Sequence, residues 1–257
     1  MSFTVEQLAA WVNAFFWPFL RVGAMTIAAP VFGSRMIAAR ARLTLAVAVT
    51  IALMAILPPP PVLVTFSVAW WTAVLQQMLI GLTMGFVLQL VFEGIVLGGM
   101  VIAMGAGLGF ATLVDPLRGV QTPVVSQYFV ILTTLLFLAL GGHLALISFV
   151  ATSFHTLPVG AIGFTPDVAR AVADYGVHLF AGAMQIALPA TLAILVVNLS
   201  FGIISRSAPS LNLFAIGLPA ALLFALAVLP MTLDAMAVVF ERRLEQAWAF
   251  IAAFIGV

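Results

Sequence analysis

Long runs of apolar residues, separated by short polar interruptions, form the main pattern along the chain. The runs cover residues 8–32, 43–57, 66–92, 124–154, 178–204 and 211–240, and residues 241–257 form a tail with a charged start and an apolar, amphipathic finish. Several runs reach or exceed the roughly 20 residues that a helix needs to cross a bilayer. The pattern predicts about six hydrophobic segments, and we do not expect all of them to cross a membrane.

Helices are the structure that these runs favour. In a bilayer the backbone polar groups must be satisfied within each segment, and a β-barrel would show short alternating segments instead. Proline bends or ends several runs: Pro58–Pro61 close the second, and others lie inside the first, fifth and sixth at Pro18, Pro189, Pro219 and Pro230. Because proline interrupts the hydrogen bonds of a helix, we expect long helices that tilt, or that bend into hairpins packed against protein. The expected fold class is an all-α membrane protein.

The composition supports a membrane environment. Hydrophobic residues make up 65% of the chain and charged residues only 7%, whereas about 25% of the residues of a soluble domain are charged. The net charge of +1 gives no sign of a nucleic-acid partner. Cysteine is absent, which excludes disulfides and thiolate metal sites. Part of the solvent of this chain must therefore be lipid or other apolar helices.

The distribution of arginines gives conflicting information about orientation. Arg35, Arg40 and Arg42 cluster between the first two runs, which predicts a cytoplasmic loop there. Arg206 precedes the sixth run and Arg242 follows it, so positive charge stands at both ends of one segment. This conflict indicates that the chain does not cross the membrane as a simple serpentine.

Familiar catalytic patterns are absent from the sequence. It contains no GxxxxGK[ST] phosphate loop, which argues against ATP hydrolysis. The GxGxG spacing that begins at Gly105 follows an apolar helix, whereas a dinucleotide fingerprint follows a strand. The three histidines stand apart from carboxylates at metal-ligand spacing, so we expect them at helix ends or interfaces. We predict a non-enzymatic protein without a cofactor or a metal site.

Two charged residues lie within apolar runs and are candidates for buried charges. Glu93 is either a cavity-lining, proton-responsive carboxylate or a structural partner of an arginine or of backbone groups. Arg21 either pairs with an acid across helices or extends toward an interface. For both residues the structural role is the preferred interpretation.

Glycines concentrate between the third and fourth runs and predict two different features. Gly94 and Gly98, four residues apart, are typical of close helix packing. From Gly105 onward a loop is expected, because Asp115-Pro116 favours a turn and Gly119 tolerates positive φ. The residues proposed for a plug or gate in this loop are Gly105, Gly107, Gly109, Phe110, Asp115, Pro116, Arg118, Gly119 and Pro123.

Several stretches together resemble the FliR family, the flagellar export-gate subunits whose counterpart in virulence injectisomes is SctT. They extend in order along nearly the whole chain and are residues 21–33, Glu93-Gly94, residues 98–109, Asp115-Pro116, residues 121–123, residues 137–143 and residues 205–219. The most specific element is Arg-x-x-Pro-x-x-Asn, formed by Arg206, Pro209 and Asn212 after a long apolar helix.

The resemblance implies an architecture of kinked helical hairpins. A FliR-like chain is similar to a fusion of FliP-like and FliQ-like subunits, so residues 1–175 would be the FliP-like part and residues 176–257 the FliQ-like hairpin with its tail. In the family a plug from the FliR-like chain closes the pore, and its position matches residues 105–123. The turn formed by Arg206, Pro209 and Asn212 would face the cytoplasmic entrance, near a FlhB-like partner.

The resulting hypothesis is a subunit of the flagellar type III export gate, in the bacterial inner membrane at the flagellar basal body. Its expected partners are FliP-like, FliQ-like and FlhB-like subunits, membrane lipid, and unfolded secreted proteins, but no nucleic acid. Three alternatives remain open at the level of sequence. They are an injectisome gate subunit, a proton-coupled secondary transporter that uses Glu93, and a membrane scaffold without a pore.

Overall fold

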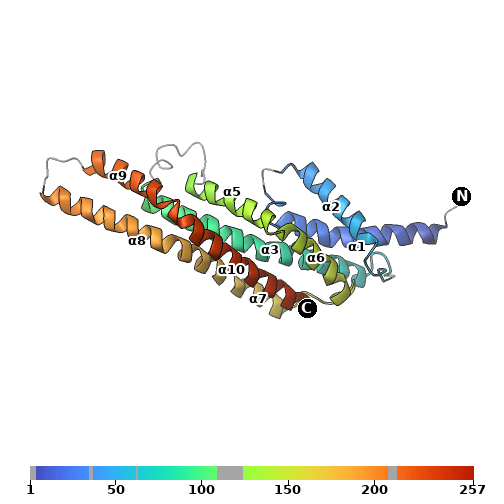
Figure 1. The fold of residues 1–257 in the computed structure, drawn as a ribbon. Coiled ribbons are helices and arrows are strands. Elements are labelled where there is room, and N and C mark those ends of the chain that lie inside the picture. The colour runs from blue at the N-terminus through green and yellow to red at the C-terminus, as the bar shows by residue number, and fades with distance from the viewer. Residues whose placement is uncertain (1–3, 35–36, 62, 109–123, 208–212) are drawn as a thin grey trace. The chain divides into compact units, whose positions relative to one another are not determined.

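The computed structural model describes residues 4–34, 37–61, 63–108, 124–207 and 213–257. The regular structure of these residues is helical throughout, which confirms the expected fold class (Figure 1). The helices are α1 (Val5–Ala28), α2 (Ala39–Met54), α3 (Val68–Gly105), α5 (Val124–Ala139), α6 (Gly142–Thr156), α7 (Pro166–Tyr175), α8 (Val177–Ser207), α9 (Leu213–Val228) and α10 (Met231–Ile255).

Local sequence explains where several helices begin and end. Thr4 caps α1 in a capping box, since its hydroxyl accepts a bond from the Gln7 backbone and the Gln7 side chain accepts one from the Thr4 backbone. The four prolines at 58–61 follow the end of α2, as the sequence predicts. Pro18 and Pro189, by contrast, lie inside α1 and α8 without ending either helix.

Two of the predicted segments are divided by sharp bends. The segment at residues 124–154 becomes α5 and α6, which meet at 61° next to Gly141, a residue with a φ of 68°. The segment at residues 211–240 becomes α9 and the first part of α10, with a bend of 52°. That bend lies at Leu229-Pro230, where the ring of Pro230 cannot continue the helical bonding. The bend that proline predicts is confirmed at Pro230, whereas the bend at Gly141 involves no proline.

The longest helices are those with the length and hydropathy of membrane spans. Within the described residues, α3 and the stretch Pro166–Ile204 each meet this description, since each contains 18 consecutive residues with a mean hydropathy of 2.1. The number rises to four if each bent pair counts as one span. The chain is therefore an all-α membrane protein with two to four candidate spans in its described part, fewer than the six apolar segments of its sequence.

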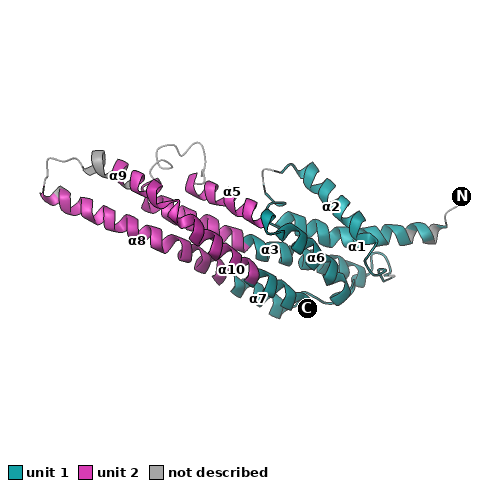
Figure 2. Ribbon diagram, viewed as in Figure 1, with its two compact units in different colours: residues 1–89, 138–175, 246–257 teal, residues 90–137, 176–245 magenta. Residues whose placement is uncertain are grey.

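The chain forms two compact units, each made from separate stretches of sequence (Figure 2). Unit 1 comprises residues 1–89, 138–175 and 246–257, and its core includes Trp17, Met25 and Ile80. Unit 2 comprises residues 90–137 and 176–245. In its core the ring of Phe92 packs edge-on against Phe137 and Phe240, with centroids 5.5 Å away in both cases. One boundary between the units, after Tyr175, falls where the sequence predicts the FliQ-like hairpin to begin; the two-part division remains a prediction.

Candidate functional site

In unit 1, the backbones of α1 and α3 approach each other closely at two glycines of α3. A Cβ added at Gly85 would lie 2.7 Å from the nitrogen of Ala29 and 2.8 Å from the carbonyl oxygen of Met25. A Cβ at Gly81 would collide with the carbonyl oxygen of Arg21. Gly81 faces Arg21 and Gly85 faces Met25, so the residue numbers of both contacting pairs differ by 60. The two helices therefore run parallel. Only glycine permits this distance between the helices.

In unit 2, the same kind of packing joins α3 to α8. A Cβ at Gly94 would lie 2.9 Å from the carbonyl oxygen of Leu179, and one at Gly98 would lie 3.2 Å from that of Ala183. These two helices are also parallel, because the contacts advance together along both. The predicted role of Gly94 and Gly98 in helix packing is confirmed.

The end of α3 is defined by a glycine cap. The nitrogen of Leu108 donates to the Ala103 carbonyl at 3.0 Å, the nitrogen of Gly107 donates to the Met104 carbonyl at 3.1 Å, and Gly107 has a φ of 79°. This pair of bonds, with glycine in the left-handed conformation, is a Schellman motif. Gly105 is the last residue of α3 and Gly107 caps the helix, so the helix ends within one residue of the position from which the sequence predicts a loop.

Most of the residues predicted for the plug lie outside the described part of the chain. They are Gly109, Phe110, Asp115, Pro116, Arg118, Gly119 and Pro123. The structure does define both attachment points of this segment, which are the cap after α3 and the start of α5 at Val124. At that end of unit 2, a Cβ at Gly99 would lie 2.9 Å from Cα of Ser126, so α3 and α5 are in direct contact.

Arg21 is completely buried in unit 1, with 0% of its surface exposed. Its guanidinium donates from Nε to Oε1 of Gln77 (2.8 Å), from Nη1 to Oγ of Ser153 (2.7 Å) and from Nη2 to the carbonyl of Leu157 (2.8 Å). Its Cζ also lies 3.9 Å from the ring centroid of Phe154. These neutral partners, rather than the acid that the sequence suggested, offset the cost of burying the charge and hold α1, α3 and α6 together.

Glu93, which the sequence analysis names as a candidate buried charge, is exposed. Its side chain is exposed on α3, although its neighbours Phe92 and Gly94 are both buried. The physical reason is helical geometry: α3 turns Phe92 and Gly94 toward the α8 and α10 side of unit 2, and residue 93 lies on another face. The carboxylate therefore lies on the outer surface of the single chain.

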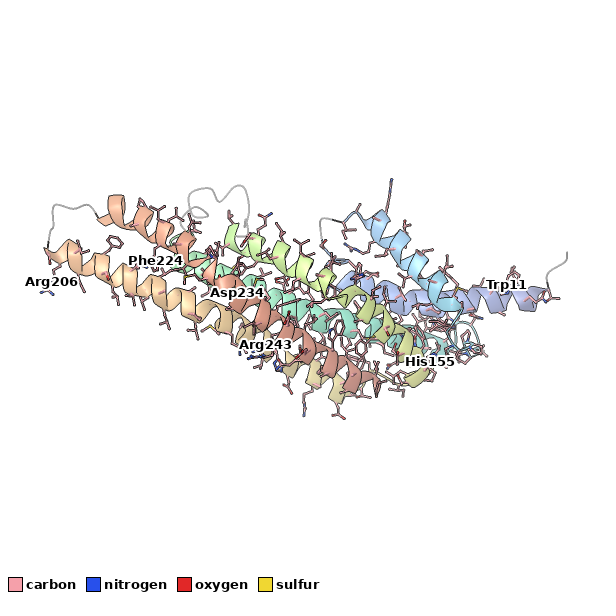
Figure 3. All side chains as sticks on the ribbon, in the orientation of Figure 1. Trp11, His155, Arg206, Phe224, Asp234 and Arg243 are labelled. Atoms are coloured by element: carbon pink, nitrogen blue, oxygen red, sulfur yellow. The ribbon has the colours of Figure 1, made fainter. Side chains whose placement is uncertain are left out.

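Of the predicted cytoplasmic turn, the structure describes Arg206 only. Arg206 lies in the last turn of α8 with an exposed side chain at the end of that helix (Figure 3). Pro209 and Asn212 fall outside the described residues, so the arrangement of the three remains a prediction.

Sequence reasoning missed a polar pair in unit 2. Nη1 of Arg243 on α10 lies 3.0 Å from Nδ1 of His178 on α8, and Arg243 is only 7% exposed (Figure 3 labels Arg243). Gly182, one turn after His178, lies beside the arginine, and a Cβ there would make an ordinary contact with Nε at 3.7 Å. The pair could have been found from the helical spacing of the apolar residues Met236, Phe240, Ala247 and Ile251, which are buried. This spacing places position 243 on the same buried face of α10.

The described residues contain no group of three or more His, Asp or Glu side chains that could hold a metal ion.

The fold and the site define an all-α membrane protein. In this protein α3 packs closely against its neighbours through glycines and leads into the segment 109–123. The sequence of the chain matches the family described as bacterial export proteins, family 1, over residues 12–247. The chain belongs to this family and, within it, to the FliR proteins.

The relatives support this assignment over the whole chain. The chain is 35% identical to the flagellar biosynthetic protein FliR of Escherichia coli (strain K12) over 256 residues, which cover 100% of this chain and 98% of the relative. It is 39% identical to the FliR protein of Pectobacterium carotovorum subsp. carotovorum over 221 residues, or 85% and 84% of the two chains. The FliR protein of Aquifex aeolicus (strain VF5) is 29% identical over 92% of both chains. The chain is thus a membrane-embedded component of flagellar export.

Proposed function

We propose that this chain is a non-enzymatic subunit of the flagellar type III export gate, which helps to form and close the channel for unfolded flagellar proteins. The observation that carries the proposal is the similarity to FliR proteins over the full length of the chain. In this proposal the chain lies in the bacterial inner membrane at the flagellar basal body and assembles with FliP-like, FliQ-like and FlhB-like subunits.

The structure around residues 109–123 supports the role of this segment as the plug. Its first end follows a helix cap at Gly107, and its second end leads into α5, which contacts α3 through Gly99 and Ser126. The two helices to which the segment is joined are therefore packed against each other, whatever the sequence between them. A gate that must yield to many unfolded chains requires such a tethered closure rather than a sequence-specific one.

The surface of α8 supports assembly with other membrane subunits. In the stretch Pro166–Ile204, which contains most of α8, only 22% of the 18 most apolar consecutive residues are buried within the chain. Its exposed side chains include Leu192, Leu195 and Leu199. A face of this composition requires lipid or further apolar helices to cover it. FliP-like and FliQ-like helices are the partners that we propose for it.

Deletion of residues 110–117 tests the plug. This deletion leaves the cap at Gly107 and the start of α5 intact, so the ends of the segment are preserved. We expect the assembled complex to leak ions across the inner membrane, measured as loss of membrane potential in cells, while the wild-type complex does not. Co-purification with the FliP-like and FliQ-like chains provides the control for assembly. An intact membrane potential in cells that assemble the deleted chain would contradict the plug.

One observation favours a second candidate function. Glu93 is an exposed carboxylate on α3, a helix that contains 18 consecutive residues with a mean hydropathy of 2.1, and intramembrane acids often line ion pathways. A proton-coupled transporter would use it. The purified single chain in liposomes should then move a solute or protons, and Glu93→Gln should abolish that movement. Activity that requires the FliP-like and FliQ-like chains favours the export gate instead.

A further inference from the structure

An apolar groove of about 350 Å³ lies in unit 1 between α1 and α2. Its walls include Leu20, Gly23 and Ile27 from α1, Leu43 and Ala46 from α2, and Met78 from α3. Nothing lies within 4 Å of the position that a Cβ would take at Gly23, so the groove is open there. Its rim is exposed and apolar, since 60% of Ile27 and 56% of Leu43 are exposed. The volume falls within the range of about 300–1,000 Å³ that is typical of small-ligand sites.

Positive charge lies at one end of the groove. Arg42 is part of the lining, and its guanidinium is fixed there by bonds to three carbonyl oxygens, those of Phe32 (3.0 Å), Gly33 (3.3 Å) and Ser34 (3.1 Å). Arg40, in the same first turn of α2, is exposed. A guanidinium that is already held in position loses little conformational freedom when an anion binds to it.

The N-terminus of α2 adds to this positive end. Ala39, the first residue of α2, also lines the groove. Ala38 provides no side-chain cap, and the first turn contains no acidic residue. The backbone N–H groups of residues 39–41 precede the first helical bond, which Arg42 donates to the Ala38 carbonyl at 3.1 Å, and they carry the positive end of the helix dipole. An anionic group at the mouth of the groove would therefore meet Arg42 and the helix terminus together.

We propose that this groove binds an anionic phospholipid. One acyl chain would lie along the apolar walls, and the headgroup phosphate would lie at Arg42 and the first turn of α2. Basic pockets between membrane helices bind such headgroups in other proteins. A neutral lipid would match the walls but not the charged end, and a soluble anion would match the charged end but not the walls.

The test compares dioleoyl phosphatidylglycerol with dioleoyl phosphatidylcholine. The two lipids have identical acyl chains, and their binding to the purified full-length chain in detergent is measured by native mass spectrometry. We expect the chain to retain the anionic lipid at least fivefold more tightly, which corresponds to about one favourable charge at the surface. Equal retention of the two lipids would overturn the proposal.

The headgroup site is tested by a matched pair at Ala38. This residue has the extended backbone of an N-cap, with φ −56° and ψ 140°, so both Ala38→Asp and Ala38→Asn should cap α2 without harm to the fold. Only the aspartate places a negative charge at the phosphate position. We expect Ala38→Asp to weaken binding of phosphatidylglycerol about fivefold and Ala38→Asn to leave it unchanged. An equal effect of the two variants would contradict the headgroup position.

The acyl-chain site is tested by filling the groove. Gly23→Leu places a side chain in the open part of the groove, and Gly202→Leu, at an equally open glycine of α8, is the matched control. We expect only Gly23→Leu to reduce the retention of both lipids. A photoreactive residue in place of Leu43 should cross-link to lipid in membranes. Cross-linking of that position to a protein chain would show that a helix occupies the groove and would overturn the proposal.

Discussion

Arg21 and Ser153 are joined by a hydrogen bond of 2.7 Å, although 132 residues separate them in the sequence. Ser153 Oγ in turn donates to the Val150 carbonyl at 2.6 Å, so the hydroxyl both accepts and donates. The bond connects the middle of α1 to the last turns of α6 and is therefore a long-range constraint on unit 1.

Removal of the Arg21 side chain should destabilise unit 1. Arg21→Ala deletes three donors and leaves a cavity among buried groups, and we expect a loss of about 2–5 kcal/mol in the free energy of unfolding. Thermal unfolding of the chain in detergent measures the effect. Arg170→Ala on α7 is the control, since Arg170 is exposed and its loss should change stability by less than about 0.5 kcal/mol. Equal effects of the two variants would contradict the structural role of Arg21.

A single methyl group at Gly94 should separate α3 from α8. Gly94→Ala places Cβ 2.9 Å from the backbone oxygen of Leu179, which cannot yield as a side chain would, and we expect a cost of about 1–3 kcal/mol. Gly202→Ala has open space around it and should instead stabilise α8 by about 0.5–1 kcal/mol, because alanine favours a helix. Opposite shifts in the unfolding temperature of these variants are the expected result.

Alanine substitutions at Gly107 and Gly105, near the end of α3, should have different effects on stability. Gly107→Ala forces alanine into a φ of 79°, at a cost of roughly 1–2 kcal/mol. Gly105→Ala is helical and meets only Thr191 Cγ2 at 3.6 Å, which is an ordinary contact, so this variant should be neutral or slightly stabilising. Stability in detergent checks the first effect. Ion leakage in cells checks whether a misplaced cap also loosens the following segment, and leakage from Gly105→Ala would contradict this interpretation.

Arg243 and His178 should be energetically coupled. A double-mutant cycle with His178→Leu and Arg243→Met removes the 3.0 Å contact in steps, and we expect a coupling energy of about 0.5–1.5 kcal/mol. Chemical unfolding of the four chains gives the value. Additive effects of the two substitutions would mean that the contact contributes nothing to the packing of α8 on α10.

The sequence predicted the features that depend on local chemistry. Proline and glycine positions explain the breaks near Pro58 and Pro230, and the four-residue spacing of Gly94 and Gly98 correctly indicated helix packing. Hydropathy could not reveal the bend at Gly141, because both flanking helices are apolar and the break depends on one backbone angle.

Side-chain environments were harder to predict because they depend on distant partners. Arg21 is satisfied by Gln77, Ser153 and Leu157, residues that composition alone does not mark as partners of a charge. Glu93 looked buried because its neighbours in sequence are apolar, but burial depends on which face of α3 a residue occupies. The Arg243–His178 pair was missed for the same reason, because its two residues are 65 positions apart in the sequence.

The parallel packing of α3 on α8 imposes a delay during synthesis. Gly98 contacts Ala183, which leaves the ribosome 85 residues later. At roughly 5–20 residues per second, the glycine face of α3 waits about 4–17 s for its partner helix. During that interval the glycine face of α3 is exposed and can pack against helices other than α8, including those of neighbouring nascent chains. The order in which the helices emerge is therefore itself a constraint on how this protein enters the membrane.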